Sequence, residues 1–377
     1  MAALGFVIGG VLLVNEGRSK SRRVSILSEK GTKGVGFRSV RGRVVGIQCS
    51  AAGSGQSSAG QGSQRIVTPL GRTLKVGFYF GLWYFFNVVF NVLNKSTLNV
   101  WSYPWTLSLV QLGGGSLYCA LLWILGLRQK PNVSWGLLRA MILPVLGHLG
   151  GHVLTCVSFS MVAISFSHVV KSAEPAFGAA AAALALREFY PWTVYASLIP
   201  IISGVALAAV TELTFTWAGF ITALLSNVAF AARNVFSKIT MKNYKDDPTL
   251  GSRNMYGLIS IVAFLLELPM ALIADRGIPK LIPATSSAVS PNTLLLYILS
   301  SAIMYHLYNE SSYMALGQVS PVTFSVGNTV KRVIIIVASI LVFKTKFLPL
   351  NAFGMIIALL GTFLYSWTKE RASRKPA

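Results

Sequence analysis

The chain has 377 residues, of which 53% are hydrophobic and 12% are charged, and its mean hydropathy is +0.61. Because charged residues make up about a quarter of an ordinary soluble domain, this composition excludes a soluble protein and indicates a polytopic membrane protein. The formal net charge of +22 would suggest nucleic-acid binding in a soluble protein. Here Lys and Arg do not alternate with aromatic residues on a polar face, so no nucleic-acid partner is expected.

The N-terminal segment differs in composition from the apolar rest of the chain. Residues 1–65 are rich in Arg, Ser and Gly and hold ten Lys or Arg against two acids, Glu16 and Glu29. This composition is typical of an organellar transit peptide, which is removed from the mature protein. A disordered basic tail is the alternative. The apolar start Met1–Val14 resembles the core of a secretory signal without its positive flank, so a two-step targeting signal stays open as well.

Ten apolar segments follow this N-terminal segment, each near the roughly 20 residues that a membrane-spanning helix needs. In chain order these segments are 76–94, 104–126, 136–159, 163–186, 191–210, 215–236, 254–273, 292–315, 320–343 and 348–367. The sequence therefore predicts an all-α membrane protein with one ten-helix domain at 75–367, followed by a basic tail at 368–377.

An even number of spans places both ends of this domain on one side of the membrane, and most loop Lys and Arg gather there. They are Arg72, Lys75, Arg128, Lys130, Arg187, Lys238, Lys242, Lys245, Arg253 and the basic residues of 369–375. We name this the basic side. By the positive-inside rule it is expected to face the inner compartment.

A weak internal repeat divides the domain into halves at about 75–210 and 215–367. A shift of 158 residues aligns Ile164–Ser167 with Val322–Ser325, and Pro191 with Pro349. Five spans in each half is an odd number, so the two halves are expected to insert with opposite topology. Inverted repeats with a site between them at the middle of the membrane are the plan of many secondary transporters.

Cations lie where a bilayer makes charge expensive. Lys171 interrupts the fourth span, Lys331 and Arg332 interrupt the ninth, and Arg233 follows the apolar run of the sixth. Charged residues within membrane spans normally face a cavity and mark a substrate path. Since Glu174 is the one acid among these runs, the missing negative charge is expected to be an anionic ligand. The repeat places Lys171 and the Lys331–Arg332 pair at nearly corresponding positions, where they could converge.

The type of donor indicates which anion. Arginine offers a planar fork to two phosphate oxygens, and lysine adds a point charge. His152 and Thr155 are three residues apart on one helix face, and the Thr155 hydroxyl can donate to a phosphate oxygen. This set predicts a phosphate site. The alternative is helix packing for Thr155, and a core or interfacial position for Tyr308.

Five stretches carry longer motifs: Asn87–Asn91, Val162–Pro175, Thr211–Leu213, Arg233–Lys238 and Ser320–Arg332. They resemble signature sequences of the plastid phosphate translocators, and the likeness runs from about Lys75 to Ser366. This resemblance implies a ten-helix drug/metabolite-transporter fold. It also implies strict exchange of inorganic phosphate for a phosphorylated metabolite across the plastid inner envelope. The segment Val44–Ala52 resembles a plastid processing site.

The resemblance further implies roles for single residues. The residues expected to hold the phosphate common to all cargoes are Thr155, Lys171, Lys331 and Arg332. Those expected to meet the rest of the substrate are His152, Arg233, Tyr308 and Phe324. Besides inorganic phosphate, the partners it implies are phosphorylated C3, C5 or C6 metabolites and membrane lipid.

Different sequence features favour different branches of the family. Thr323–Thr329 and Ser311–Met314 resemble the hexose and pentose phosphate branches, because the other branches tend to have histidine at the position of Phe324. His152 speaks against the phosphoenolpyruvate branch, whereas the stretch Asn243–Arg253 fits that branch equally well. Phosphoenolpyruvate and triose phosphate therefore stay open as cargoes. Glu310 departs from the family, which usually has glutamine there, and could repel the substrate or face away from it.

Two other classes of protein are alternatives to this family. A membrane enzyme that transfers a phosphoryl group or a lipid chain would need acidic metal ligands or a nucleophile beside a base. The spans hold no acidic cluster, and Cys49, Cys119 and Cys156 lack metal or redox spacing, so no catalytic residue, metal or cofactor is expected. A Golgi nucleotide-sugar carrier of the same superfamily is the remaining alternative.

Overall fold

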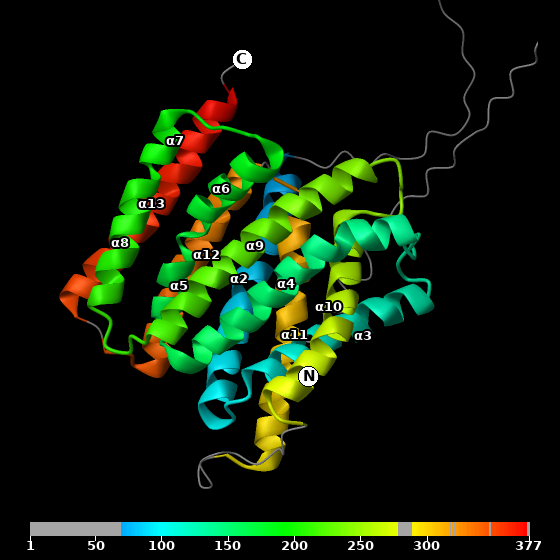
Figure 1. Ribbon diagram of the computed structural model, residues 1–377, viewed down its shortest axis with the longest axis horizontal. Helices are drawn as coiled ribbons and strands as arrows, with labels where there is room; N and C mark the ends of the chain where they lie inside the picture. Colours follow the sequence, from blue (N-terminus) through cyan, green and yellow to red (C-terminus); the bar gives the residue numbers. More distant parts are fainter. Residues whose placement is uncertain (1–68, 278–288, 317, 320, 347, 375–377) are drawn as a thin grey trace, which may run out of the picture. The chain divides into compact units, whose positions relative to one another are not determined.

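The computed structural model describes residues 69–277, 289–316, 318–319, 321–346 and 348–374 (Figure 1). The predicted transit peptide, residues 1–65, lies outside the described residues. Within the described ranges the chain is helical and contains no strand. The predicted all-α class is confirmed.

Each of the ten predicted spans is helical. The helices are α2 (Pro69–Val100), α3 (Pro104–Ile124), α4 (Trp135–Met161), α5 (Ile164–Lys171), α6 (Glu174–Leu186), α7 (Trp192–Ala196), α8 (Leu198–Val210), α9 (Trp217–Asn243), α10 (Ser252–Ala274), α11 (Pro291–Leu316), α12 (Pro321–Phe343) and α13 (Pro349–Arg374). By length and apolar composition, nine segments in the described part of the chain could cross a membrane, with α5–α6 and α7–α8 each counted as one. The remaining predicted span, the eighth, corresponds to α11, which is as long but carries His306, Asn309 and Glu310, which lower its hydropathy.

Two spans that the sequence predicts as continuous helices are broken, the fourth between α5 and α6 and the fifth between α7 and α8. Pro175 has no backbone N–H to donate, so α5 ends at Lys171 and α6 begins at Glu174 with the proline in its first turn. The hydroxyl of Ser172 donates to Val169 O at 2.5 Å and satisfies a carbonyl at the break. Such compensation is needed where water is absent. The break places the Lys171 cation at a helix C-terminus and the Glu174 carboxylate at a helix N-terminus, and both placements complement the helix dipoles.

The helices pair as the predicted repeat requires. Helix α4 packs along α9, and α2 packs along α11. In the predicted repeat α2 is equivalent to α9 and α4 to α11, so the two contacts are equivalent to each other. Helix α3 packs on α10, and α8 packs on α13 (Figure 1). Both pairs join equivalent spans of the two halves. The α8–α13 crossing depends on Gly204, since a Cβ there would lie 2.4 Å from the backbone nitrogen of Ala358.

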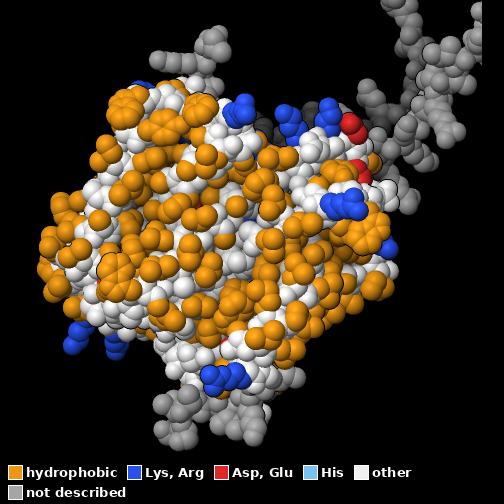
Figure 2. All heavy atoms as spheres, viewed as in Figure 1, with side chains coloured by type: hydrophobic (Ala, Val, Ile, Leu, Met, Phe, Trp, Pro, Cys, Tyr) orange, Lys and Arg blue, Asp and Glu red, His pale blue; other side chains and the backbone are white. Residues whose placement is uncertain are grey.

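The outer surface suits a lipid environment. Large apolar side chains such as Leu121, Ile142 and Leu225 are exposed. Figure 2 shows apolar side chains across the middle of one face and Lys and Arg side chains toward its ends. This distribution matches a hydrocarbon layer flanked by two polar interfaces.

Candidate functional site

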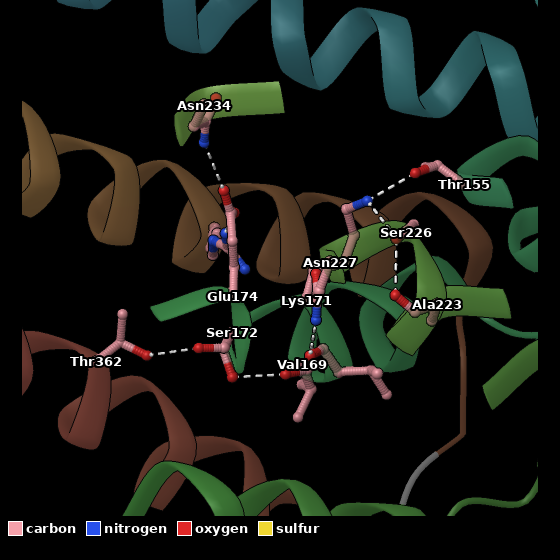
Figure 3. A network of polar contacts seen from close by, with 12 residues as sticks. Thr155, Val169, Lys171, Ser172, Glu174, Ala223, Ser226, Asn227, Asn234 and Thr362 are labelled. Atoms are coloured by element: carbon pink, nitrogen blue, oxygen red, sulfur yellow. Dashed lines mark hydrogen bonds and ion pairs between the residues drawn. The ribbon is translucent and has the colours of Figure 1, made fainter. Parts of the chain in front are cut away.

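Lys171 connects three helices through its ammonium group. At the C-terminus of α5, its Nζ atom donates to Thr155 Oγ1 of α4 at 2.6 Å and to Ser226 Oγ of α9 at 3.1 Å (Figure 3). The same nitrogen lies 4.8 Å from the ring centroid of Phe230. The predicted association of Lys171 with Thr155 is therefore present in the geometry. Ser226 was not predicted, because a lone serine in an apolar run carries no signal that distinguishes a ligand from a packing residue.

Arg332 forms the second centre of the site. Its guanidinium nitrogen NH2 lies 2.5 Å from Glu174 Oε2, and the side chain is buried at 5% exposure. The other terminal nitrogen, NH1, is buried and has no hydrogen-bond partner among the described residues. The second oxygen of Glu174 accepts a long hydrogen bond of 3.5 Å from Asn234 Nδ2 of α9 (Figure 3). Arg332 therefore keeps one donor available for a ligand.

Lys331 and Phe324 meet on the same aromatic ring of α2. The Nζ atom of Lys331 lies 4.9 Å from the centroid of a Trp83 ring, a cation–π geometry. Phe324 stacks on Trp83 with a centroid distance of 4.8 Å and an interplanar angle of 5°. The two residues are seven positions apart on α12, so they share a helix face. Trp83 is a functional candidate that sequence reasoning missed.

The remaining predicted residues form a polar and aromatic cluster beside Lys171. Arg233 NH1 lies 3.2 Å from His148 Nδ1, and His148 Nε2 lies 3.2 Å from the Tyr305 hydroxyl. The His152 ring packs 4.2 Å from the Tyr305 ring, and its Nε2 is buried without a partner in the described part of the protein. Tyr308 packs edge-on to Tyr305 at 5.5 Å. Tyr305 therefore contacts His152 and Tyr308 directly and Arg233 through His148, so it links three of the four residues that were expected to meet the rest of the substrate.

Arg233 lies inside the sixth span, as predicted, but the helix is longer than expected. The span was predicted to end at residue 236, whereas α9 continues to Asn243. Arg233 therefore lies inside a helix, where its Nε and NH2 atoms donate to Asn234 Oδ1 at 3.1 and 2.8 Å. The helix extends because Lys238 and Lys242 supply a polar end that reaches out of the apolar layer.

The four cations act on one another and on a single carboxylate. Lys171 and Lys331 each interact electrostatically with Arg332, Arg233 and Glu174. Removal of such charges from water costs several kcal/mol per ion unless partners compensate for it. One carboxylate among four cations leaves an excess of positive charge. The arrangement can therefore bind an anion with more than one negative charge.

A cavity of about 320 Å³ gives access to this centre. Glu174, Asn234 and Arg332 line its inner part, and Lys238 and Lys369 near the ends of α9 and α13 line it toward the basic side. A second cavity, of about 390 Å³, lies at the opposite helix ends beside Lys95 and includes none of the predicted site residues.

Glu310 does not present a free charge to the site. Its carboxylate forms an ion pair with the Arg128 guanidinium from the connection after α3, and both side chains are largely buried. Of the two expectations for this residue, repulsion of the substrate has no support in this geometry. The charge of the carboxylate is offset by the paired guanidinium of Arg128.

The helices of the two halves pack in equivalent pairs, and a buried cationic centre lies among them. This architecture is that of a polytopic membrane transporter. The model of the Triose-phosphate Transporter family matches residues 74–366, and the chain belongs to this family. The chloroplastic xylulose 5-phosphate/phosphate translocator of Arabidopsis thaliana is 46% identical over 297 residues, which cover 78% of this chain and 70% of the relative.

Other relatives are similar over comparable lengths. The chloroplastic glucose-6-phosphate/phosphate translocator 1 of Arabidopsis thaliana is 43% identical, with 79% of this chain and 76% of the relative covered. The chloroplastic phosphoenolpyruvate/phosphate translocator 1 of Oryza sativa subsp. japonica is 40% identical, with 89% and 80% covered. Together with the helices that can span a membrane, these relatives identify a multi-pass plastid membrane protein.

Proposed function

We propose that the protein exchanges inorganic phosphate for a phosphorylated sugar across the plastid inner envelope, with its basic side toward the stroma. The observation that carries this proposal is the buried cationic centre. Lys171, bonded to Thr155, lies within electrostatic range of Arg332, which has an unused donor. The names of the relatives as sugar phosphate/phosphate translocators support the same activity.

In this proposal the phosphate group binds at one common place for every cargo. The residues that bind it are Thr155, Lys171, Lys331 and Arg332. A phosphate dianion would take the free NH1 donor of Arg332 and part of the Lys171 ammonium, which now bonds to hydroxyl groups. Charge-assisted hydrogen bonds of this kind are roughly twice as strong as neutral ones. Neutral hydroxyl partners are therefore readily exchanged for phosphate oxygens.

The rest of the substrate would meet His152, Arg233, Tyr308 and Phe324. His152 has an unpartnered ring nitrogen and Phe324 lies on Trp83, so the surroundings combine hydrogen-bond donors with an apolar wall. A sugar presents hydroxyl groups on a largely uncharged body and suits such a lining. A pentose or hexose phosphate is therefore the proposed cargo, with triose phosphate or phosphoenolpyruvate as the second candidate.

Strict exchange follows from the charge of the centre. A closed carrier without ligand would bury several cations at a cost of several kcal/mol per ion. A bound phosphate group removes most of this cost by pairing with the cations. The loaded carrier then crosses its closed state far more often than the empty carrier, so nearly every outward step is followed by a return step with cargo. The two halves would move against each other around a fixed site, as in other inverted-repeat transporters.

This activity needs no chemical step, so we assign no catalytic residue. The relatives are named translocators and the family is one of transporters, which supports transport rather than catalysis. No metal or cofactor enters the proposed mechanism.

The test is counter-exchange of labelled phosphate in liposomes that contain the purified protein. The trapped substrate is varied among xylulose 5-phosphate, glucose 6-phosphate, triose phosphate, phosphoenolpyruvate and a nucleotide sugar. The proposal predicts fastest uptake against a pentose or hexose phosphate. Uptake driven by phosphoenolpyruvate alone would contradict the proposed cargo, and uptake driven by the nucleotide sugar alone would contradict the proposed function.

A further inference from the structure

Among the residues that the structure describes, Glu174 is the one acid at the cationic centre, and the proposed mechanism gives it no role. It follows Lys171 by three residues, yet Lys171 bonds to Thr155 and Ser226 instead. The carboxylate of Glu174 reaches across to α12 and pairs with Arg332 at 2.5 Å. It therefore lies against a guanidinium that is expected to bind the substrate phosphate.

Three features of this pair resemble the contacts of a bound anion. Glu174 offers two oxygens, one to Arg332 and one to Asn234, which also holds the guanidinium of Arg233. The carboxylate lies in the first turn of α6, where the helix dipole favours negative charge. The same carboxylate and guanidinium line the 320 Å³ cavity. A phosphate that arrives through this cavity reaches Arg332 where the guanidinium is already occupied.

We infer that the Glu174 carboxylate is an internal counter-anion that takes the place of the substrate phosphate at Arg332 in the unloaded carrier. This inference rests on the proposed function. Phosphate binding releases Glu174 from Arg332, and departure of the phosphate lets the carboxylate return. Glu174 thus competes with the ligand and weakens its binding, which favours release on the far side of the membrane.

The inference has a second consequence, for the coupling of exchange. The Glu174 carboxylate offsets part of the charge of the four cations. This lowers the cost of burying them without a ligand, so the unloaded carrier reaches its closed state rarely rather than never. Without Glu174 the unloaded centre would bury one more uncompensated cation, at a higher cost. Removal of this acid should therefore make exchange slower and more strictly coupled, because phosphate binds more tightly and the empty carrier returns less often.

The experiment measures binding and transport of inorganic phosphate with the full-length wild-type protein and Glu174→Gln. We expect Glu174→Gln to bind phosphate about ten-fold more tightly, as for loss of one competing charge-assisted contact. Its KM for phosphate–phosphate exchange should fall similarly, its maximal rate should fall, and its one-way phosphate release should drop below wild type. A control is Glu212→Gln, which removes a carboxylate that bonds to Thr214 in the α8–α9 connection, and should match wild type.

Unchanged or weaker phosphate binding by folded Glu174→Gln would overturn the inference, as would faster one-way release. Glu174→Asp is the second variant, because it keeps the charge one methylene further from Arg332 and should give values between wild type and Glu174→Gln. A value for Glu174→Asp at or above the wild-type KM would count against the inference even if Glu174→Gln did not fold. Absence of phosphate exchange in the wild-type protein would instead contradict the proposed function.

Discussion

The ammonium group of Lys171 lies 2.6 Å from the hydroxyl oxygen of Thr155, across the contact between α5 and α4. The lysine ends a helix that Pro175 interrupts, so its position depends on a break in the fourth span. The threonine hydroxyl donates in turn to Gly151 O at 2.6 Å, which fixes the direction of its lone pairs. Backbone features therefore orient two of the four side chains that we assign to the phosphate.

Substitutions at this pair should weaken exchange in graded steps. Loss of the charge in Lys171→Met should cost about 3 kcal/mol, or roughly 100-fold in kcat/KM for phosphate. Thr155→Val loses only a hydroxyl and should cost about 1 kcal/mol, or roughly five-fold. Initial rates of labelled phosphate uptake give both values. Thr222→Val, at a half-buried threonine of α9 whose hydroxyl bonds to Ala218 O, is the control, and an equal loss in this variant would remove the basis for the assignment.

Arg332→Lys tests whether phosphate binding needs the two parallel donors of the guanidinium group or only its positive charge. Lysine keeps the positive charge but offers a point donor in place of two parallel ones. In the loaded carrier the phosphate would use both terminal nitrogens of Arg332: NH1, which has no partner among the described residues, and NH2, which Glu174 releases. We therefore expect KM for phosphate to rise by about ten-fold, as for one lost charge-assisted bond. The matched control is Arg371→Lys near the end of α13. Full activity of Arg332→Lys would mean that charge alone suffices.

Phe324→His should shift the choice of cargo. Phe324 stacks on Trp83 and offers no hydrogen bond, whereas a histidine there could donate to a second acidic group of a three-carbon substrate. We expect the ratio of kcat/KM for 3-phosphoglycerate to that for glucose 6-phosphate to rise by about ten-fold, the effect of one added hydrogen bond to a charged group. Phe324→Leu removes the stacking without adding a donor, so an equal shift in that variant would contradict the explanation.

The α8–α13 crossing should tolerate no side chain at Gly204. A Cβ atom there would lie 2.4 Å from Ala358 N and 2.7 Å from Gly354 O, and overpacking of this kind costs about 1–3 kcal/mol. Gly204→Ala should therefore lower the Tm of the purified protein. Gly77→Ala on α2 meets nothing within 4 Å and should not lower it. Equal values for the two variants would argue against the described crossing.

The ion pair between Arg128 and Glu310 is predicted to support stability rather than transport. Removal of one partner of a buried pair costs about 3–5 kcal/mol, because the other charge stays buried and unpaired. Glu310→Gln should therefore lower the Tm while KM for phosphate stays near the wild-type value. The double variant Arg128→Gln with Glu310→Gln should recover most of the lost stability. A large change in KM for Glu310→Gln alone would place this carboxylate in the substrate site.

The spans could be predicted from sequence because each depends on a local run of apolar residues. The meeting of Lys171 with Lys331 and Arg332 could be predicted because the repeat gives them equivalent positions, and both lysines interact with Arg332. The breaks at Pro175 and Ser197 were missed, although the proline supplied a readable signal at the first of them.

The aromatic and acidic partners of the site could not be predicted in the same way. Trp83 and Tyr305 lie in spans rich in aromatic residues, so their composition does not separate a contact with Lys331 or His152 from ordinary packing. Glu174 was recognised as the one acid near the cations, but which of the cations it pairs with depends on the helix break. The direction of a side chain at a break is set by tertiary contacts that a single sequence does not encode locally.

The central claim is that the cationic centre permits passage only with a phosphate group bound. The most direct measurement is release of labelled phosphate from liposomes containing the wild-type protein, with and without a phosphorylated sugar outside. The account predicts release that depends on the external substrate and exchanges one molecule for one, with only slow release into buffer. Equal rates of release in the two conditions would contradict it.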